Sequence, residues 1–318
     1  MFQQIIDANA RLNGFANKTP VLSSITLNKQ LGAQVFFKCE NFQKIGAFKF
    51  RGAFNCISQL SEQEKKRGII AYSSGNHAQA VALVGKMLGI KTTIVMPNNA
   101  PQVKLLATKD YGADVVIYDT KTQTREEVSQ KIQDQFGYSL IAPFDNHQII
   151  AGQGTSAYEL HTKVKDLNKI LVPCGGGGLL SGSAISTKGL NPKCEVIGIE
   201  PKNADDATQS FNTGKLVSQP NPDTIADGTR TACLGDITFP LIQEYVDAMQ
   251  TVTEQSIMQA VAFHLLRMKI MVEPSGALGL AALLSQTVEI VPGEKIGVII
   301  SGGNIDPSTL TKILKETI

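Results

Sequence analysis

Lys49 stands between two phenylalanines, Phe48 and Phe50, in a segment that begins with Gly46. A lysine in apolar surroundings loses solvation as a cation, so its pKa falls and the neutral amine becomes a nucleophile toward carbonyl carbons. Lys49 could therefore form a Schiff base. The alternative is a surface lysine beside two core aromatics, and the segment alone leaves both interpretations open.

Four consecutive glycines, Gly175, Gly176, Gly177 and Gly178, lie between an apolar run and Leu179. Residues without a Cβ leave backbone N–H groups bare, and the N-terminus of a following helix adds partial positive charge. These features predict a binding site for a phosphate group. A flexible strand-to-helix turn is the simpler alternative, but such a turn needs only one or two glycines.

Hydroxyl and amide side chains gather between an expected strand and an expected helix, at Ser73, Ser74, Asn76 and His77. Such groups at a helix start can bind a carboxylate, although they also serve as ordinary helix caps. After the last expected strand, Ser301 could donate to a ring nitrogen or could simply end the strand.

A short acidic loop contains Glu200 and Asp206, with Ala204 between them. Carboxylates close together on a loop suit a hard divalent cation. From the spacing alone, a solvated acidic turn is an equally good interpretation.

The elements that must position these residues alternate along the chain. Short segments rich in Val and Ile predict strands at 35–38, 68–72, 92–96, 114–118, 169–173, 195–200 and 296–301. Amphipathic segments predict helices at 61–66, 78–88, 103–111, 125–136, 155–164 and 255–268. The alternation indicates an α/β protein with mostly parallel sheets. Breaks near 67 and 144 predict a small domain of 68–144 and a large domain of 1–67 and 145–318, with a ligand cleft between them.

Composition narrows the classes of partner. The 318 residues carry 30 Lys and Arg against 28 Asp and Glu, so a net charge of +2 favours neither nucleic acid nor a membrane surface. No run of about 18 apolar residues indicates a membrane span. The five cysteines are scattered without C-x-x-C spacing, which argues against a disulfide framework and favours a cytoplasmic location.

The embedded lysine, the glycine run, the hydroxyl cluster and Ser301-Gly302-Gly303-Asn304 together resemble the fold type II pyridoxal-phosphate enzymes. Within that group the chain is similar to the branch of serine racemase, serine/threonine dehydratase and threo-3-hydroxyaspartate ammonia-lyase. The stretches at 151–155 and 224–228 are also typical of that branch. The resemblance implies two α/β domains, each with a central, mostly parallel sheet flanked by helices, and pyridoxal 5'-phosphate between them.

The resemblance implies a role for each matched residue around the cofactor. Lys49 would attach the cofactor and later act as base at the substrate Cα, and Phe48 would pack against the pyridine ring. Asn76 would donate to the phenolic oxygen, and Ser301 would meet the pyridine nitrogen. The phosphate would be held by Gly175, Gly176, Gly177, Gly178 and Leu179. A neutral hydroxyl at the ring nitrogen favours prompt loss of a β-leaving group.

The same resemblance implies the substrate contacts. Ser73, Asn76 and His77 would bind the substrate carboxylate, and Ser74 would be the second acid/base on the face opposite the lysine, as in racemases of this branch. Arg125 matches an arginine able to meet a second carboxylate, although it is equally well the solvated start of a helix.

Glu200, the Ala204 carbonyl and Asp206 match the cation ligands of the racemase branch in type and spacing, which implies Mg²⁺, or Ca²⁺ or Mn²⁺ in its place. A homodimer is expected by analogy with the family, and a nucleotide is a candidate effector.

We expect an ammonia-lyase (dehydratase) that β-eliminates water from a small amino-acid substrate: L-threonine, L-serine or threo-3-hydroxyaspartate. The products would be a 2-oxo acid and ammonia. The segment Pro143-Phe144-Asp145 is nearer to dehydratases and hydroxyaspartate lyases than to animal serine racemases. A serine racemase with side dehydratase activity is the main alternative, and a non-catalytic protein that binds pyridoxal phosphate is an alternative of another class.

Overall fold

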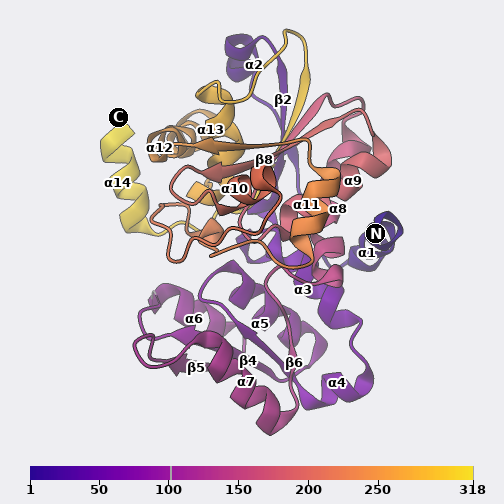
Figure 1. Ribbon diagram of the computed structural model, residues 1–318, viewed down its shortest axis with the longest axis vertical. Coiled ribbons are helices and arrows are strands. Elements are labelled where there is room, and N and C mark those ends of the chain that lie inside the picture. Colours follow the sequence, from indigo (N-terminus) through magenta and orange to yellow (C-terminus); the bar gives the residue numbers. More distant parts are fainter. Residues whose placement is uncertain (101, 318) are drawn as a thin grey trace.

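The computed structural model describes residues 1–100 and 102–317, and it contains two β-sheets that lie one above the other in Figure 1. Helices flank both sheets, so the predicted α/β class with two mostly parallel sheets is confirmed. The strands of the smaller sheet all fall between 69 and 140. The domain boundaries at 67/68 and 144/145 stay a prediction.

The larger sheet has six strands in the order β1-β2-β10-β7-β8-β9. Their bounds are β1 (Val21–Leu22), β2 (Gln34–Cys39), β7 (Lys169–Pro173), β8 (Glu195–Pro201), β9 (Ala248–Val252) and β10 (Lys295–Ile300). Only β1 is antiparallel to its neighbour. Because parallel strands end at one edge, the glycine run after β7 and Ser301 after β10 meet at the same edge of the sheet.

The smaller sheet has four parallel strands in the order β5-β4-β3-β6. Its strands are β3 (Ile69–Tyr72), β4 (Thr92–Pro97), β5 (Asp114–Tyr118) and β6 (Ser139–Leu140). It is accompanied by α4 (Glu62–Arg67), α5 (Asn76–Leu88), α6 (Gln102–Asp110) and α7 (Arg125–Phe136). The hydroxyl cluster therefore links the end of β3 to the start of α5.

The remaining helices lie around the larger sheet, with one exception. They are α1 (Phe2–Leu12), α2 (Ile25–Leu31), α3 (Lys49–Ser58), α8 (His147–Lys163), α9 (Gly178–Leu190), α10 (Asp206–Thr213), α11 (Thr238–Tyr245), α12 (Glu254–Phe263), α13 (Leu278–Leu284) and α14 (Pro307–Thr317). The exception is α3, which packs between α8 and α5. Short helical turns lie at Glu40–Phe42, Lys44–Gly46, Asp227–Thr229, His264–Met268 and Pro274–Ala277.

Two glycine contacts bring helices α3, α8 and α9 unusually close together. A Cβ on Gly152 of α8 would lie 2.6 Å from the Arg51 carbonyl of α3, and one on Gly154 would lie 2.6 Å from the Gly182 carbonyl of α9. Only glycine allows this approach, because any side chain would overlap the facing backbone. These glycines also explain why the sequence predicted a helix only from 155, whereas α8 begins at His147, capped by Asn146.

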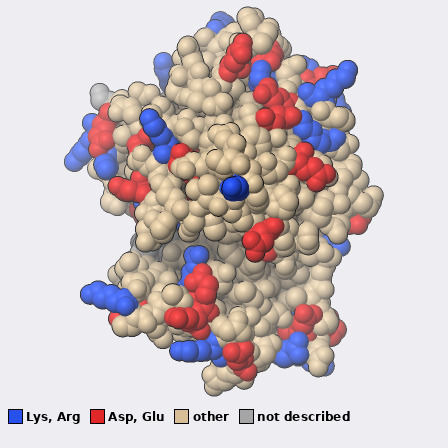
Figure 2. Space-filling view, viewed as in Figure 1, with Lys and Arg blue, Asp and Glu red and all other residues tan. Residues whose placement is uncertain are grey.

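The seven predicted strands are present, and four of the six predicted helices are present with ends shifted by at most two residues. The helix predicted at 155–164 begins at His147, and the one predicted at 255–268 ends as α12 at Phe263 and continues as the turn His264–Met268. The strands β1, β6 and β9 and helices such as α3 were not predicted. For β1 and β6 the reason is length, because two residues are too few to show a period. None of the helices in the described ranges has the length and apolar character of a membrane span. Charges of both signs are interspersed over the face shown in Figure 2.

Candidate active site

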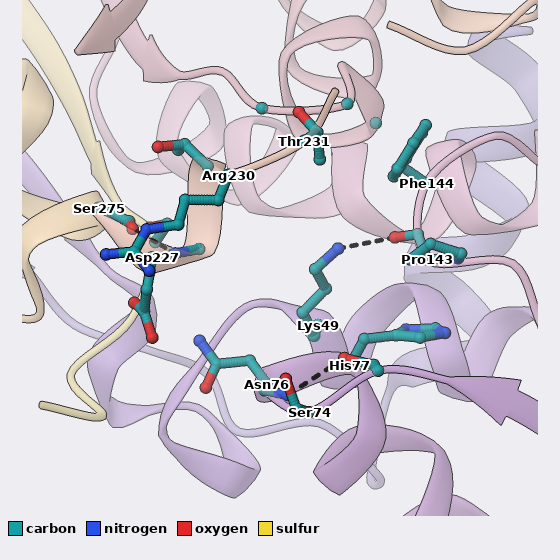
Figure 3. Close-up of a pocket in the computed structure, with 18 of the residues that line it drawn as sticks. Lys49, Ser74, Asn76, His77, Pro143, Phe144, Asp227, Arg230, Thr231 and Ser275 are labelled. Carbon is teal, nitrogen blue, oxygen red and sulfur yellow. Dashed lines mark hydrogen bonds between the residues drawn. The ribbon is translucent and has the colours of Figure 1, made fainter. Parts of the chain in front are cut away.

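A cavity of about 500 Å³ opens between the two sheets, and it collects most of the residues singled out from the sequence (Figure 3). The predicted residues that line it are Phe48, Lys49, Ser73, Ser74, Asn76, His77, Arg125, Gly175, Gly176, Gly177, Gly178, Leu179 and Ser301. The carboxylates Glu200 and Asp206 are not among its lining residues.

Lys49 is the buried amine of this cavity. Burial lowers the pKa of Lys49 to about 8, and the negative charge of Glu273 opposes that shift. The Nζ atom donates to the Pro143 carbonyl at 2.6 Å and lies 5.2 Å from the centroid of the Phe48 ring. With a pKa of about 8, roughly a tenth of the amine is neutral at pH 7, far more than for an ordinary lysine, and this neutral form is the nucleophile.

The segment before Lys49 is fixed against the end of β10. Phe48 N–H donates to the Ser301 carbonyl at 2.9 Å, and Gly303 N–H donates to the Gly46 carbonyl at 2.9 Å. Ala47 and Gly302 form an isolated antiparallel bridge between these contacts. The lysine at the start of α3 is thus tied directly to the serine that follows β10.

The glycine run lines the cavity and is closely packed, so that a side chain on it would overlap its neighbours. A Cβ on Gly176 would lie 2.4 Å from the Phe144 ring, and one on Gly177 would lie 2.8 Å from Thr238. Gly177 has φ +90° and caps α9, where no side chain accepts a hydrogen bond from the first turn. The Thr231 hydroxyl, buried at the same wall, has no hydrogen-bond partner among the described residues. Free donors beside a helix N-terminus suit a phosphate group.

The hydroxyl cluster occupies the opposite wall, at the N-terminus of α5. The Ser73 hydroxyl accepts from Gly75 N–H at 3.2 Å, and no side chain caps the helix from position Gly75. Ser74 lines the cavity beside them. A second helix N-terminus therefore opens into the same cavity, in keeping with the predicted carboxylate site.

Asn76 joins the two sheets across the cavity floor. Its Nδ2 atom donates to Glu273 at 2.9 and 3.2 Å, and its Oδ1 atom accepts from Asn304 at 2.8 Å. Since its amide is already engaged, Asn76 would have to turn one N–H toward the cavity to meet a cofactor oxygen. The contact with the phenolic oxygen stays a prediction.

His77 is buried and neutral. Burial, together with the positive charge of Lys49, lowers the pKa of His77 to about 3. Its Nε2 donates to the Ile141 carbonyl at 2.9 Å, so Nδ1 is an acceptor. This ring cannot donate to a carboxylate, which leaves the backbone N–H of His77 as its means of contact with a substrate.

Arg125 begins α7 at the rim of the cavity. Its guanidinium lies 5.0 Å above the centroid of the Tyr72 ring, and its Nε donates to Glu126 at 2.7 Å. The side chain is 51% exposed, which leaves it free to turn toward a ligand. The position of Arg125 is thus compatible both with a contact to a second substrate carboxylate and with the solvated start of a helix.

Several residues of the cavity wall were not assigned from the sequence. They are Gln153, Asp227, Thr229, Arg230, Thr231, Glu273 and Ser275. Glu273 is the most telling of them, because it is only 3% exposed and lies in the apolar stretch 270–277. A lone carboxylate in an apolar stretch is the signal that could have found it, since a buried carboxylate needs a partner.

The predicted cation ligands form a separate, buried group beneath α10. Both carboxylate oxygens of Asp206 are buried without a hydrogen-bond partner among the described residues, and burial raises the pKa of Asp206 to about 7. Burial and the charge of Asp206 raise the pKa of Glu200 well above its usual range. No group of three or more His, Cys, Asp or Glu side chains with metal-site geometry occurs in the described ranges. The ligands that the protein would offer to a cation here are the carboxylates of Glu200 and Asp206 and the Ala204 carbonyl.

Comparison with known proteins agrees with this geometry. The family model for "Pyridoxal-phosphate dependent enzyme" matches residues 12–302. The chain belongs to this family. Lys49, the glycine run and Ser301 all lie within the residues that the family model matches.

Individual relatives cover nearly the whole chain. The L-threo-3-hydroxyaspartate ammonia-lyase of Saccharomyces cerevisiae is 48% identical over 96% of this chain and 93% of its own length. The serine racemase of Schizosaccharomyces pombe is 48% identical over 99% of this chain and 97% of its own length. The crystal structure of serine racemase from Dictyostelium discoideum superposes with a TM-score of 0.91 at 44% identity, covering 96% of this chain and 99% of that chain.

The residues of the cavity fit pyridoxal phosphate. The bare glycines and the unpartnered Thr231 hydroxyl suit its phosphate, and the Lys49 amine suits its aldehyde. The Ser301 side chain, 4% exposed, lines the same cavity, and its contact with the pyridine nitrogen stays a prediction.

The lowered pKa of Lys49 predicts how pyridoxal phosphate associates with cofactor-free protein. Below pH 8 the amine is mostly protonated and unreactive, so the rate of covalent attachment should rise with pH and level off above a midpoint near 8. Stopped-flow absorbance of the bound cofactor measures this rate. A midpoint near 10.5, the ordinary value for lysine, would contradict the burial argument. Lys49→Ala, which cannot attach the cofactor, is the control.

Proposed function

We propose that the protein is a pyridoxal-phosphate-dependent ammonia-lyase that eliminates water from 3-hydroxy amino acids. The observation that carries this proposal is the buried Lys49 amine, with its pKa lowered to about 8, in a cavity with a helix N-terminus on each side. The lyase among the reported relatives supports the reaction class. Loss of water leaves an enamine, which tautomerises to an imine and takes up water again, giving a 2-oxo acid and ammonia.

The α5 N-terminus binds the substrate carboxylate. Residues of the first turn line the cavity without a side-chain cap, Ser73 and Ser74 lie beside them, and the helix dipole favours an anion there. This contact orients the substrate so that its Cα faces Lys49 Nζ. Fixing that geometry removes orientational freedom that would otherwise raise the barrier.

Lys49 Nζ moves the proton. When bound, pyridoxal phosphate supplies the electron sink that makes the substrate Cα–H acidic. The neutral Lys49 amine takes the Cα proton, and a proton must then reach the departing hydroxyl, which the Lys49 ammonium is placed to deliver. Its pKa of about 8 suits an amine that takes and returns a proton near neutral pH.

The residues that hold the cofactor follow from the cavity walls. The glycine run with Leu179 and Thr231 would hold the phosphate, Phe48 would pack on the ring, and Ser301 would meet the ring nitrogen.

We propose that residues 68–144 move as a small domain and close the cavity from bulk water, as lid domains commonly do.

The preferred substrate depends on Arg125. Its exposed guanidinium at the cavity rim is suited to a second carboxylate, which threo-3-hydroxyaspartate has and threonine and serine lack. A guanidinium binds a carboxylate through two parallel N–H···O bonds, so the contact would discriminate strongly. We therefore place threo-3-hydroxyaspartate first among the three substrates.

The decisive experiment measures 2-oxo acid release from L-threo-3-hydroxyaspartate, L-threonine and L-serine. Arg125→Gln should lower kcat/KM for hydroxyaspartate by about 10- to 100-fold, because a charged hydrogen bond contributes about 1.5–3 kcal/mol, and should change serine turnover little. Lys131→Gln, an exposed change on the same helix, is the matched control. An equal loss of kcat/KM for serine would mean that Arg125 does not select the substrate.

Normal turnover by Lys49→Ala would overturn the mechanism.

A serine racemase activity is the second candidate, and Ser74 is the observation that favours it. Its hydroxyl lines the cavity on the α5 wall, so it could donate a proton to the Cα face that Lys49 does not reach. Ser74→Ala should suppress formation of D-serine from L-serine while sparing elimination from L-substrates. Chiral chromatography of serine and parallel keto-acid assays measure the two rates. Equal loss of both would refute the two-face assignment.

We also propose a divalent cation, Mg²⁺ or in its place Ca²⁺ or Mn²⁺, at Glu200, the Ala204 carbonyl and Asp206. Two adjacent buried carboxylates, one of them without a hydrogen-bond partner in the described ranges, are costly unless a cation compensates them.

Removal of the cation tests this site. Saturating Mg²⁺ should raise the melting temperature of chelator-treated protein, since ligand at about 100 times its dissociation constant stabilises by about 2.7 kcal/mol. Asp206→Asn should abolish the shift, whereas Asp205→Asn on the neighbouring residue should retain it. An identical melting temperature with and without Mg²⁺ would make the group a plain acidic turn.

A homodimer, a nucleotide effector and a cytoplasmic location are proposed by family analogy. The exposed apolar side chains of Phe42 and Met271 support a covered surface, and their segments are joined by a 3.1 Å bond from Asn41 Nδ2 to the Met271 carbonyl.

A further inference from the structure

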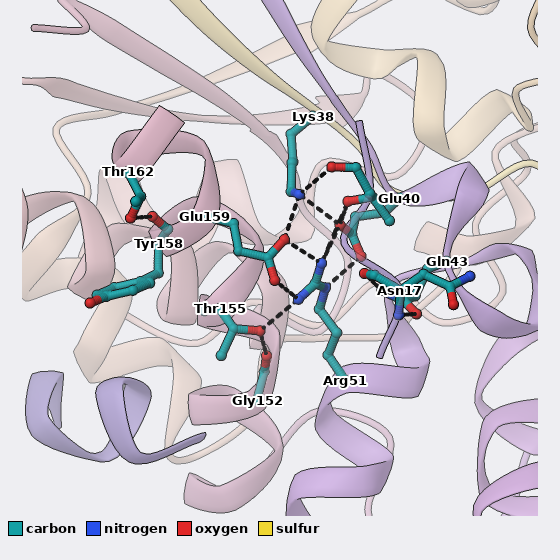
Figure 4. A network of polar contacts seen from close by, with 12 residues as sticks. Asn17, Lys38, Glu40, Gln43, Arg51, Gly152, Thr155, Tyr158, Glu159 and Thr162 are labelled. Atoms are coloured by element: carbon teal, nitrogen blue, oxygen red, sulfur yellow. Dashed lines mark hydrogen bonds and ion pairs between the residues drawn. The ribbon is translucent and has the colours of Figure 1, made fainter. Parts of the chain in front are cut away.

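Arg51 lies two residues after Lys49 in the first turn of α3, and it is completely buried. Residues two apart on a helix point to nearly opposite sides. Lys49 therefore faces the cavity, while Arg51 points into the protein between β2 and α8 (Figure 4). The two cations share one helical turn but have separate surroundings.

All five N–H groups of the Arg51 guanidinium have acceptors. Two go to Glu40, with Nε to Oε2 at 2.7 Å and Nη2 to Oε1 at 2.9 Å. Two go to Glu159, with Nη1 to Oε1 at 2.7 Å and Nη2 to Oε2 at 2.9 Å. The fifth reaches the Thr155 hydroxyl at 3.2 Å. A planar guanidinium with every donor used is held in one orientation.

These acceptors come from two different elements. Glu40 follows β2, whereas Thr155 and Glu159 belong to α8. Lys38 of β2 adds a second cation, donating to Glu159 at 2.6 Å and lying 3.9 Å from Glu40. Two cations and two anions thus form a neutral cluster that joins the larger sheet to α8 and α3 (Figure 4). The cluster is buried except at Glu159, whose side chain is 24% exposed.

The backbone at Arg51 is fixed as well. The Arg51 carbonyl and Gly52 Cα both lie 2.6 Å from where a Cβ on Gly152 would be, and Gly52 N–H donates to the Gln153 side chain at 3.2 Å. The first turn of α3 is therefore clamped on its protein side, immediately beside the residue that carries the reactive amine.

Stability alone does not account for this cluster. Replacing a complete buried ion pair with apolar groups of similar volume is often neutral or stabilising, because desolvation offsets the attraction. What such a cluster supplies is orientation, and a displacement of about 1 Å at a reacting group can cost about 100-fold in rate.

We propose that Arg51, held by Glu40 and Glu159, is a positioning residue that fixes the first turn of α3 so that Lys49 Nζ meets the cofactor and substrate. The inference rests on the proposed role of Lys49.

The test removes the cation and its buried partner together, as Glu40→Gln with Arg51→Met, in the cofactor-loaded enzyme. The melting temperature should stay within a few degrees, kcat should fall at least about tenfold, and KM should change less than about twofold. The fraction of cofactor that borohydride traps on Lys49, measured by mass spectrometry over a range of pH, should fall and shift toward higher pH. Unchanged kcat and trapping in the folded variant would overturn the proposal.

The matched control is a second ion pair far from the amine. Lys169 donates to Glu294 at 2.7 and 2.9 Å at the amino ends of β7 and β10, at the opposite edge from the cavity. Lys169→Met with Glu294→Gln should leave kcat and trapping unchanged. An equal loss in this control would mean that kcat reports general stability, and it would overturn the positioning role.

Two single variants cover the case in which the double variant does not fold. Arg51→Lys keeps the charge but has three donors and no planar fork, so it should give a kcat loss smaller than that expected for Arg51→Met. Glu159→Gln weakens only the tie to α8 and should reduce kcat with unchanged KM. Normal kcat and trapping in both would refute the proposal. If borohydride traps no cofactor on Lys49 of the unaltered protein, the proposed function fails instead.

Discussion

The burial of one lysine amine is the constraint on which the rest of the structure depends. Moving a cation out of water costs solvation free energy, and for this reason the pKa of Lys49 is lowered. A hydrogen bond to the Pro143 carbonyl and the nearby charge of Glu273 offset part of that cost. Each response also serves chemistry, because an amine with a pKa of about 8 can both attack a carbonyl and exchange a proton near neutral pH. The amine is useful only because its surroundings hold it in place.

The two sheets supply those surroundings from opposite sides. The larger sheet brings the glycine run and Ser301 to one edge, where bare backbone and the α9 N-terminus form the proposed phosphate site. The smaller sheet presents the α5 N-terminus across the cavity, and Asn76 connects the two through Glu273 and Asn304. Two anionic groups, a phosphate and a carboxylate, can thus be held at opposite ends of one cavity, each at a helix N-terminus.

Buried charge is distributed in three separate groups with different consequences. The Arg51 cluster is neutral and fully hydrogen-bonded, so it imposes geometry. Lys49 and Glu273 face the cavity, where a charge change accompanies reaction. Glu200 accepts hydrogen bonds from Ala207 and Thr208, whereas Asp206 has no hydrogen-bond partner in the described ranges, and this imbalance is the reason for proposing a cation there.

The sequence by itself determined the α/β class, seven of the strands, and the residue types that gather in the cavity, because hydrophobic period and glycine or hydroxyl clusters are local signals. Only the tertiary structure decided how these residues are used. It joined Asn76 to Glu273 across 197 positions, tied His77 Nε2–H to the Ile141 carbonyl so that only Nδ1 is left as an acceptor, and surrounded Arg51 with carboxylates from two elements. Such contacts depend on which strand ends meet at a sheet edge and on which helices cross at glycines, and no local pattern carries that information.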